Sequence, residues 1–187
     1  MKRHALLPLL SGIAAAALSF SSVAGTAPAD NLRVVIIRHG EKAESGHNLS
    51  CKGENRALLL PAVLHRKFNV PDHLYVTSTA IGKSNAHFRM LETIIPFAVK
   101  YDVKINTEFD VSAFSALAGD VLQKHGTVLI VWEHVGIPAL ASQLGVSNPP
   151  NWRGKDFDSI WVITYVDGKA SLSIEQEGIV PPIECNF

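Results

Sequence analysis

Two continuous runs of apolar and β-branched residues constrain the fold of this chain more than any other feature. Residues 32–37 read Leu-Arg-Val-Val-Ile-Ile, and residues 127–132 read Thr-Val-Leu-Ile-Val-Trp. A strand with one solvated face alternates apolar and polar side chains, so these runs indicate strands that are buried on both faces. Such strands are typical of parallel sheets covered by helices on both sides.

Segments with helical spacing alternate with short apolar segments along the rest of the chain. The expected helices are residues 51–67, 84–100, 111–124 and 137–145. The further expected strands are residues 74–77, 103–105, 159–165 and 170–174. Asp167-Gly168, between the last two, is a strong signal for an antiparallel hairpin. We therefore expect one α/β domain with three α/β/α layers, a mostly parallel central sheet and a C-terminal antiparallel hairpin.

Capping residues and prolines refine the expected helices. Ser50 and Asp110 are good N-caps for the helices over 51–67 and 111–124, because their side-chain oxygens can accept from free backbone N–H groups. Pro61 and Pro96 lie inside two of the expected helices and should kink or divide them, since proline removes one helical hydrogen bond.

The N-terminal residues 1–27 have the layout of a secretory signal peptide. Lys2 and Arg3 precede an apolar run that ends near Phe20, and small residues follow it. A membrane anchor is the alternative, but the run is shorter than the roughly 20 residues that a spanning helix needs. We expect a mature domain over residues 28–187, periplasmic or secreted, without a stable membrane anchor.

The charge balance argues against a nucleic-acid partner. The 17 Lys and Arg residues match 17 Asp and Glu residues. Loss of Lys2 and Arg3 with the signal peptide would leave 15 and 17, a net charge of −2. Nucleic-acid binders usually carry a basic excess or a basic stripe, and neither occurs here. Any affinity for phosphate must come from a local cluster of residues.

Two cysteines, Cys51 and Cys185, lie in the expected mature chain. In an oxidising compartment an even number of cysteines suggests a disulfide, which here would tie the C-terminus to an early loop. The alternative is two unrelated thiols, because spacing alone does not give geometry.

Both long apolar runs end in a histidine. Arg38-His39-Gly40-Glu41 follows the first strand, and Glu133-His134 follows the second. In open α/β sheets ligands bind beyond the carboxyl ends of the strands, so we expect His39 and His134 to lie at one edge. The planar guanidinium of Arg38 matches the geometry of phosphate oxygens. Arg89 is the best candidate for a second arginine, with a solvated helix surface as its alternative role. We interpret the cluster as a phosphate-handling site.

Four segments together resemble the histidine phosphatase superfamily, in particular its phosphoglycerate mutase-like branch. They are residues 38–41, residues 49–57, residues 77–78 with residues 89–93, and residues 128–134, which appear in the order and spacing of that family. The resemblance covers nearly all of the expected mature chain.

This resemblance implies a mechanism in which His39 attacks phosphorus and forms phosphohistidine, which water then hydrolyses. Arg38, Arg89 and His134 would hold the phosphoryl oxygens. The chemistry requires no metal and no cofactor, and the substrate would be a small or larger phosphorylated molecule.

The proton donor to the leaving group stays open between two carboxylates. Glu133 comes first, because a carboxylate at the end of a buried strand needs a partner or a function. Glu108 comes second, since it lies in the loop region where many relatives carry their acid. Glu41 is expected to orient the loop after His39 or to pair with a cation.

Residues 79–88 form a longer connection than the compact turn of many relatives. Lys83, Asn85 and His87 lie there and would line the substrate entrance, unless the stretch is an ordinary solvated loop. The leading function is an exported phosphomonoesterase. The alternative is a catalytically weak phosphate-binding envelope protein, with a phosphomutase in third place.

Overall fold

The structure, a computed structural model, describes residues 28–79 and 87–185. The expected signal peptide, Lys83 and Asn85 lie outside the described residues. Six strands form a single sheet in the order β3-β2-β4-β1-β5-β6. The strands are β1 (Arg33–Arg38), β2 (His73–Val76), β3 (Ile105–Asn106), β4 (Thr127–Trp132), β5 (Ser159–Val166) and β6 (Lys169–Gln176).

The strand directions confirm the predicted sheet. Strand β4 is parallel to its neighbours β1 and β2, and β2 is parallel to β3. Strand β5 is antiparallel to both β1 and β6. The turn between β5 and β6 has positive φ at Asp167 (51°) and Gly168 (71°), which is the backbone that a tight hairpin needs.

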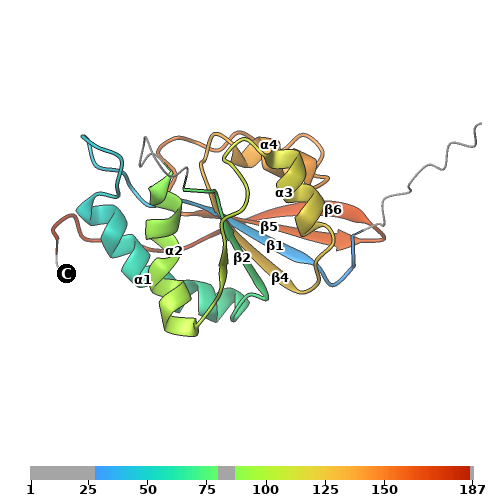
Figure 1. Cartoon of the computed structure of the whole chain (residues 1–187), viewed down its shortest axis with the longest axis horizontal. Helices are drawn as coiled ribbons and strands as arrows, with labels where there is room; N and C mark the ends of the chain where they lie inside the picture. Colours follow the sequence, from blue (N-terminus) through green and yellow to red (C-terminus); the bar gives the residue numbers. More distant parts are fainter. Residues whose placement is uncertain (1–27, 80–86, 186–187) are drawn as a thin grey trace, which may run out of the picture.

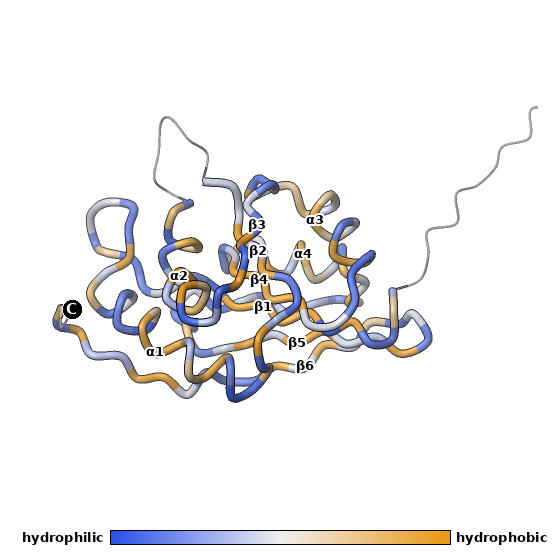
Figure 2. The backbone as a smooth tube through the Cα atoms, turned by 60° about the horizontal axis from the view of Figure 1, so that its bottom comes forward, coloured by the Kyte–Doolittle hydropathy of each residue, from blue (hydrophilic) through white to orange (hydrophobic). Residues whose placement is uncertain are grey.

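Among the residues that the structure describes, four helices cover the two faces of the sheet (Figure 1). They are α1 (Cys51–Phe68), α2 (Phe88–Tyr101), α3 (Phe114–Val121) and α4 (Ile137–Gln143). Strand β1 shows why its sequence is apolar throughout. Val35 and Ile37 pack with α1 and α2, whereas Val34 and Ile36 pack with α3 and α4. In Figure 2 the hydrophobic colour accordingly runs along the central strands, while the helices alternate between the two colours. The three-layer prediction is confirmed.

The helix predicted over residues 111–124 is shorter than expected, and the prediction of Asp110 as its N-cap is wrong. Helix α3 begins at Phe114, and its N-cap residue, Ala113, makes no side-chain capping bond. The carboxylate of Asp110 instead accepts a hydrogen bond from the Ser78 hydroxyl at 2.7 Å. Trp132 Nε1 donates to the carbonyl of Val111 at 3.1 Å. These two bonds hold residues 110 and 111 against β2 and β4, outside the helix.

Helix α1 begins where Ser50 predicted it. The Ser50 hydroxyl accepts from the N–H of Gly53 at 3.2 Å, which confirms the cap. Pro61 does not divide α1, which runs for 18 residues, and Pro96 does not divide α2, which runs for 14. Leu60 and Leu64 are buried on either side of Pro61, and this packing sustains the helix despite the missing N–H.

The residues after β6 return to the start of α1. A disulfide joins Cys51 to Cys185, with a Cα–Cα distance of 4.8 Å, which confirms the predicted pair. Asn55 Nδ2 donates to the carbonyls of Pro182 and Glu184 at 3.1 and 2.7 Å. Residues 177–185, which we call the C-terminal segment, are thus fixed along the first turns of α1. Within the described part of the chain, no helix is both long and apolar enough to cross a membrane.

Candidate active site

A cavity of about 210 Å³ lies at the carboxyl ends of the two central strands β1 and β4. Arg38 pairs in register with Trp132, so His39 and Glu133, the next residue of each chain segment, reach the same edge of the sheet. The cavity is lined by Arg38, His39, Lys42, Arg89, Glu133, His134, Val135, Gly154 and Phe157. Five of the six residues predicted from the sequence to be catalytic are therefore brought together.

Arg38 is the most firmly held residue of the cavity. Its Nη1 donates to the carbonyls of Gly154 and Asp156, both at 2.9 Å. Its guanidinium carbon lies 3.7 Å from the centre of the Phe157 ring, in a cation–π contact. Its Nε is buried without a hydrogen-bond partner among the described residues. Burial lowers the pKa of Arg38 to about 10, so the side chain is still a cation at neutral pH.

His134 is oriented by Arg38. Arg38 Nη2 lies 3.2 Å from Nδ1 of His134. Because a guanidinium can only donate, Nδ1 must accept and the proton of a neutral His134 lies on Nε2. Burial, followed by the charge of Arg38, lowers the pKa of His134. The ring therefore offers an N–H donor without adding a positive charge.

His39 is oriented by its own backbone. Nδ1 of the ring lies 2.7 Å from the carbonyl of Gly40. A carbonyl only accepts, so Nδ1 carries the proton and the lone pair lies on Nε2. Burial is the main cause that lowers the pKa of His39 to about 4, and the charges of Arg38 and Arg89 add to it against the opposing effect of the Gly40 carbonyl. His39 is therefore a neutral imidazole at physiological pH, with an unprotonated Nε2.

The low pKa of His39 has a testable consequence. The folded ring should stay neutral down to about pH 5 and titrate near the value of about 4, instead of the ordinary 6.5. The unfolded state then binds more protons between these two values, so the free energy of unfolding should fall as the pH falls through this window. Histidine ring-proton NMR across a pH series, assigned with His39→Ala, measures this directly. A His39 midpoint near 6.5 would contradict it.

Arg89 lies on the first turn of α2, at the other side of the cavity. Its Nη1 donates to the carbonyl of His47 at 2.8 Å, and its Nη2 lies 3.9 Å from a carboxylate oxygen of Glu133. The same oxygen lies 3.6 Å from Nδ1 of His87. Nε of Arg89 and Nδ1 of His87 are buried and have no hydrogen-bond partner within the described residues. Arg38 and Arg89, which both line the cavity, thus each have a buried Nε–H without a partner among the described residues.

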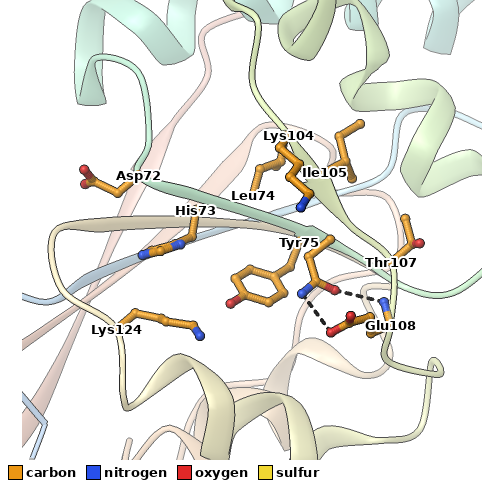
Figure 3. A pocket seen from close by; sticks show the side chains of 10 residues that line it. Asp72, His73, Leu74, Tyr75, Lys104, Ile105, Thr107, Glu108 and Lys124 are labelled. Atoms are coloured by element: carbon orange, nitrogen blue, oxygen red, sulfur yellow. Dashed lines mark hydrogen bonds between the residues drawn. The ribbon is translucent and has the colours of Figure 1, made fainter.

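Glu108, the second candidate for the proton donor, does not join this group. It lines a separate cavity of about 400 Å³ beside β2 and the edge strand β3. Figure 3 shows Glu108 there, where its N–H donates to Asn106 Oδ1 at 2.9 Å and its carboxylate accepts from Asn106 Nδ2 at 3.2 Å. Of the two carboxylates, Glu133 is the one in the cavity with His39.

Lys42, Val135, Gly154 and Phe157 also line the cavity, and the sequence did not mark them as members of it. His87, which the sequence suggested for the substrate entrance, lies beside the cavity residue Glu133. Phe157 and Gly154 belong to a connection before β5 that has no periodicity, so only their contacts with Arg38 reveal them. The described residues contain no group of three or more His, Cys, Asp or Glu side chains arranged to hold a metal ion.

The architecture matches that of solved phosphatases. The protein histidine phosphatase SixA, in complex with tungstate, aligns with a TM-score of 0.57 at 18% identity, over 78% of this chain and 97% of that one. A mutant phosphoserine phosphatase from Entamoeba histolytica, in complex with phosphoserine, gives 0.54 at 14% identity, over 79% and 98%. A mycobacterial glucosyl-3-phosphoglycerate phosphatase with inorganic phosphate gives 0.53 at 14% identity, over 76% and 95%.

These structural relatives are histidine phosphatase superfamily proteins, and the chain has their fold. No protein-family model and no curated protein matches the sequence.

Proposed function

We propose that the chain belongs to the histidine phosphatase superfamily and hydrolyses phosphomonoesters through a phosphohistidine formed on His39. One observation carries this proposal: a neutral His39, with its lone pair on Nε2, lines a cavity with two guanidinium groups. A phosphoryl dianion would be attracted by both cations, and their buried Nε–H groups would donate to its oxygens. His134 Nε2–H would supply a further donor.

The reaction proceeds in two displacements at phosphorus. Nε2 of His39 attacks, the bond between phosphorus and the ester oxygen breaks, and Glu133 gives its proton to the departing oxygen. A water molecule then gives a proton back to Glu133 and attacks phosphorus, which breaks the P–N bond and releases inorganic phosphate.

The proposal includes export. The basic and apolar layout of residues 1–27 and the Cys51–Cys185 disulfide support a periplasmic or secreted protein. The proposed enzyme takes a small or larger phosphorylated molecule, and it uses neither a metal nor a cofactor. Binding of phosphate without turnover is the competing function.

A panel of aryl and alkyl phosphomonoesters tests the proposal on the mature protein and on Glu133→Gln. Wild type should hydrolyse both kinds of ester in the presence of EDTA. Glu133→Gln should lose about 10²-fold or more in kcat on alkyl esters, whose leaving oxygen needs a proton, and much less on 4-nitrophenyl phosphate, whose leaving group is a stable anion. Absence of turnover on every ester, with phosphate still bound, would replace the enzyme by the binding function. Equal losses on both esters would remove Glu133 as the proton donor.

A further inference from the structure

A buried cluster of charged side chains lies behind the loop that follows His39. Arg56 of α1 is 4% exposed, and Glu177 of the C-terminal segment is 3% exposed. Arg56 Nη1 donates to Glu177 at 2.6 Å, and its Nε and Nη2 donate to the two carboxylate oxygens of Glu41, both at 2.9 Å. Arg56 of α1 thus links the loop that follows His39 to the C-terminal segment.

The carbonyl that orients His39 lies in the peptide unit next to Glu41. The Gly40 carbonyl, which accepts from Nδ1 of His39, belongs to the peptide unit between Gly40 and Glu41. On one side, the Gly40 N–H donates to Thr93 Oγ1 at 2.8 Å. On the other side, the Glu41 carbonyl accepts from the N–H of Ser50 at 2.8 Å and from its hydroxyl at 3.1 Å. The side chain of Glu41, which accepts from Arg56 and lies 3.6 Å from Lys52 Nζ, is a further constraint on this peptide.

The loop that follows His39 packs directly against α1, so a shift of Arg56 would also move this loop. A Cβ at Gly40 would lie 3.0 Å from the carbonyl oxygen of Gly53, and a Cβ at Gly53 would overlap the backbone of Glu41. Backbone here packs against backbone, without a flexible side chain between them. A displacement of the start of α1 therefore moves the Gly40–Glu41 peptide.

We propose that Arg56, held between Glu41 and Glu177, is a positioning residue that fixes the Gly40 carbonyl and, through it, the tautomer and direction of the His39 ring. Burial of charged groups costs desolvation free energy, and apolar side chains of similar volume often give equal or greater stability. What the ion cluster provides is one defined geometry for the loop. This inference rests on the proposed role of His39 as nucleophile.

The tautomer of His39 provides a readout that does not depend on turnover. In protein with isotope-labelled histidine, NMR distinguishes rings protonated at Nδ1 from rings protonated at Nε2. In wild type, His39 should be protonated at Nδ1. In Glu177→Gln, and in Glu41→Gln, a measurable fraction should shift to the other tautomer, because the carbonyl is held less firmly. In the same variants kcat should fall about tenfold, with KM within about twofold.

Glu175→Gln is the matched control. Glu175 precedes Glu177 by two residues and also pairs with a cation of α1, Lys67, at 2.9 Å, but this pair is partly exposed and does not contact the loop. The control should keep the wild-type tautomer and kcat.

A double-mutant cycle separates positioning from general stability. Glu41→Gln and Glu177→Gln act through the same arginine, so their effects on kcat should not be additive. Additive effects, or an unchanged His39 tautomer in the folded variants, would overturn the proposal. If Glu177→Gln fails to fold, the tautomer of His39 is measured in Glu41→Gln alone, because Glu41 is more exposed than Glu177. If wild type shows no turnover, the proposed function fails, while the tautomer shift still decides the role of Arg56.

Discussion

Replacement of His39 by alanine is expected to reduce kcat on phosphomonoesters by a factor on the order of 10⁴ or more, because it removes the proposed nucleophilic atom. Arg38, Arg89 and His134 would remain to bind the phosphate, so affinity for inorganic phosphate should change far less than kcat. The fold should persist, since the backbone at this position is held by the bonds of Gly40 to Thr93 and of the His39 N–H to the Trp132 carbonyl.

Rapid mixing with radiolabelled ester, followed by a quench at high pH, measures the intermediate in the same experiment. Wild type should carry label that is stable to base and lost in acid, as expected for phosphohistidine, and His39→Ala should carry none. His125→Ala, at an exposed residue outside the cavity, is the control and should match wild type. If His39→Ala keeps its activity, or if the label survives acid, His39 is not the nucleophile.

Loss of the Cys51–Cys185 disulfide should have the second large effect, this time on stability. The bridge spans 134 residues. For a loop of this length the chain-entropy model gives about 5 kcal/mol, while measured bridges typically contribute 2–4 kcal/mol. We expect reduction to lower the free energy of unfolding by about 3 kcal/mol, which corresponds to a fall in Tm of roughly 10 °C.

Thermal unfolding with and without dithiothreitol gives this result. The double variant Cys51→Ser/Cys185→Ser is the control: it should unfold at the lower temperature and should not respond to the reductant. A wild-type Tm that stays within about 2 °C on reduction would show that the bridge contributes little. Because residues 177–185 also hold Glu177 against Arg56, the reduced protein should in addition show weaker turnover before it unfolds.

The parts of the structure that follow from local pattern could be predicted from the sequence. Continuous apolar runs predicted the central strands, since a strand covered on both faces has no position for a polar side chain. Parallel strands direct their carboxyl ends to one edge of the sheet. The strand pattern alone therefore predicts that His39 lies near Glu133 and His134. The Ser50 cap was predictable because the bond it makes spans only three residues.

The features that could not be predicted from the sequence depend on contacts between residues far apart in the chain. Asp110 has the side chain of a good N-cap, but its carboxylate accepts a hydrogen bond from Ser78, 32 residues earlier in the chain. Glu108 follows the edge strand β3, and the course of that loop is set by bonds such as that from the N–H of Ser78 to the Phe109 carbonyl at 2.7 Å. Phe157 has no periodic neighbours, and its ring contacts with Arg38 and His39 identify it. Sequence periodicity carries no information on such pairings.

The central place of β1 also determines when the site can form during folding. Strand β1 is early in the sequence but lies between β4 and β5, and Val34 pairs with Val128 on one side and Ile163 on the other. Helices and the β5–β6 hairpin need only local contacts. The pairing of β1 with β4 and β5 joins residues far apart in the chain, and closing such long segments is slow. His39 and His134 meet only after β1 has docked. Recovery of the proposed activity during refolding should therefore report the completion of the sheet, which signals from helix content do not.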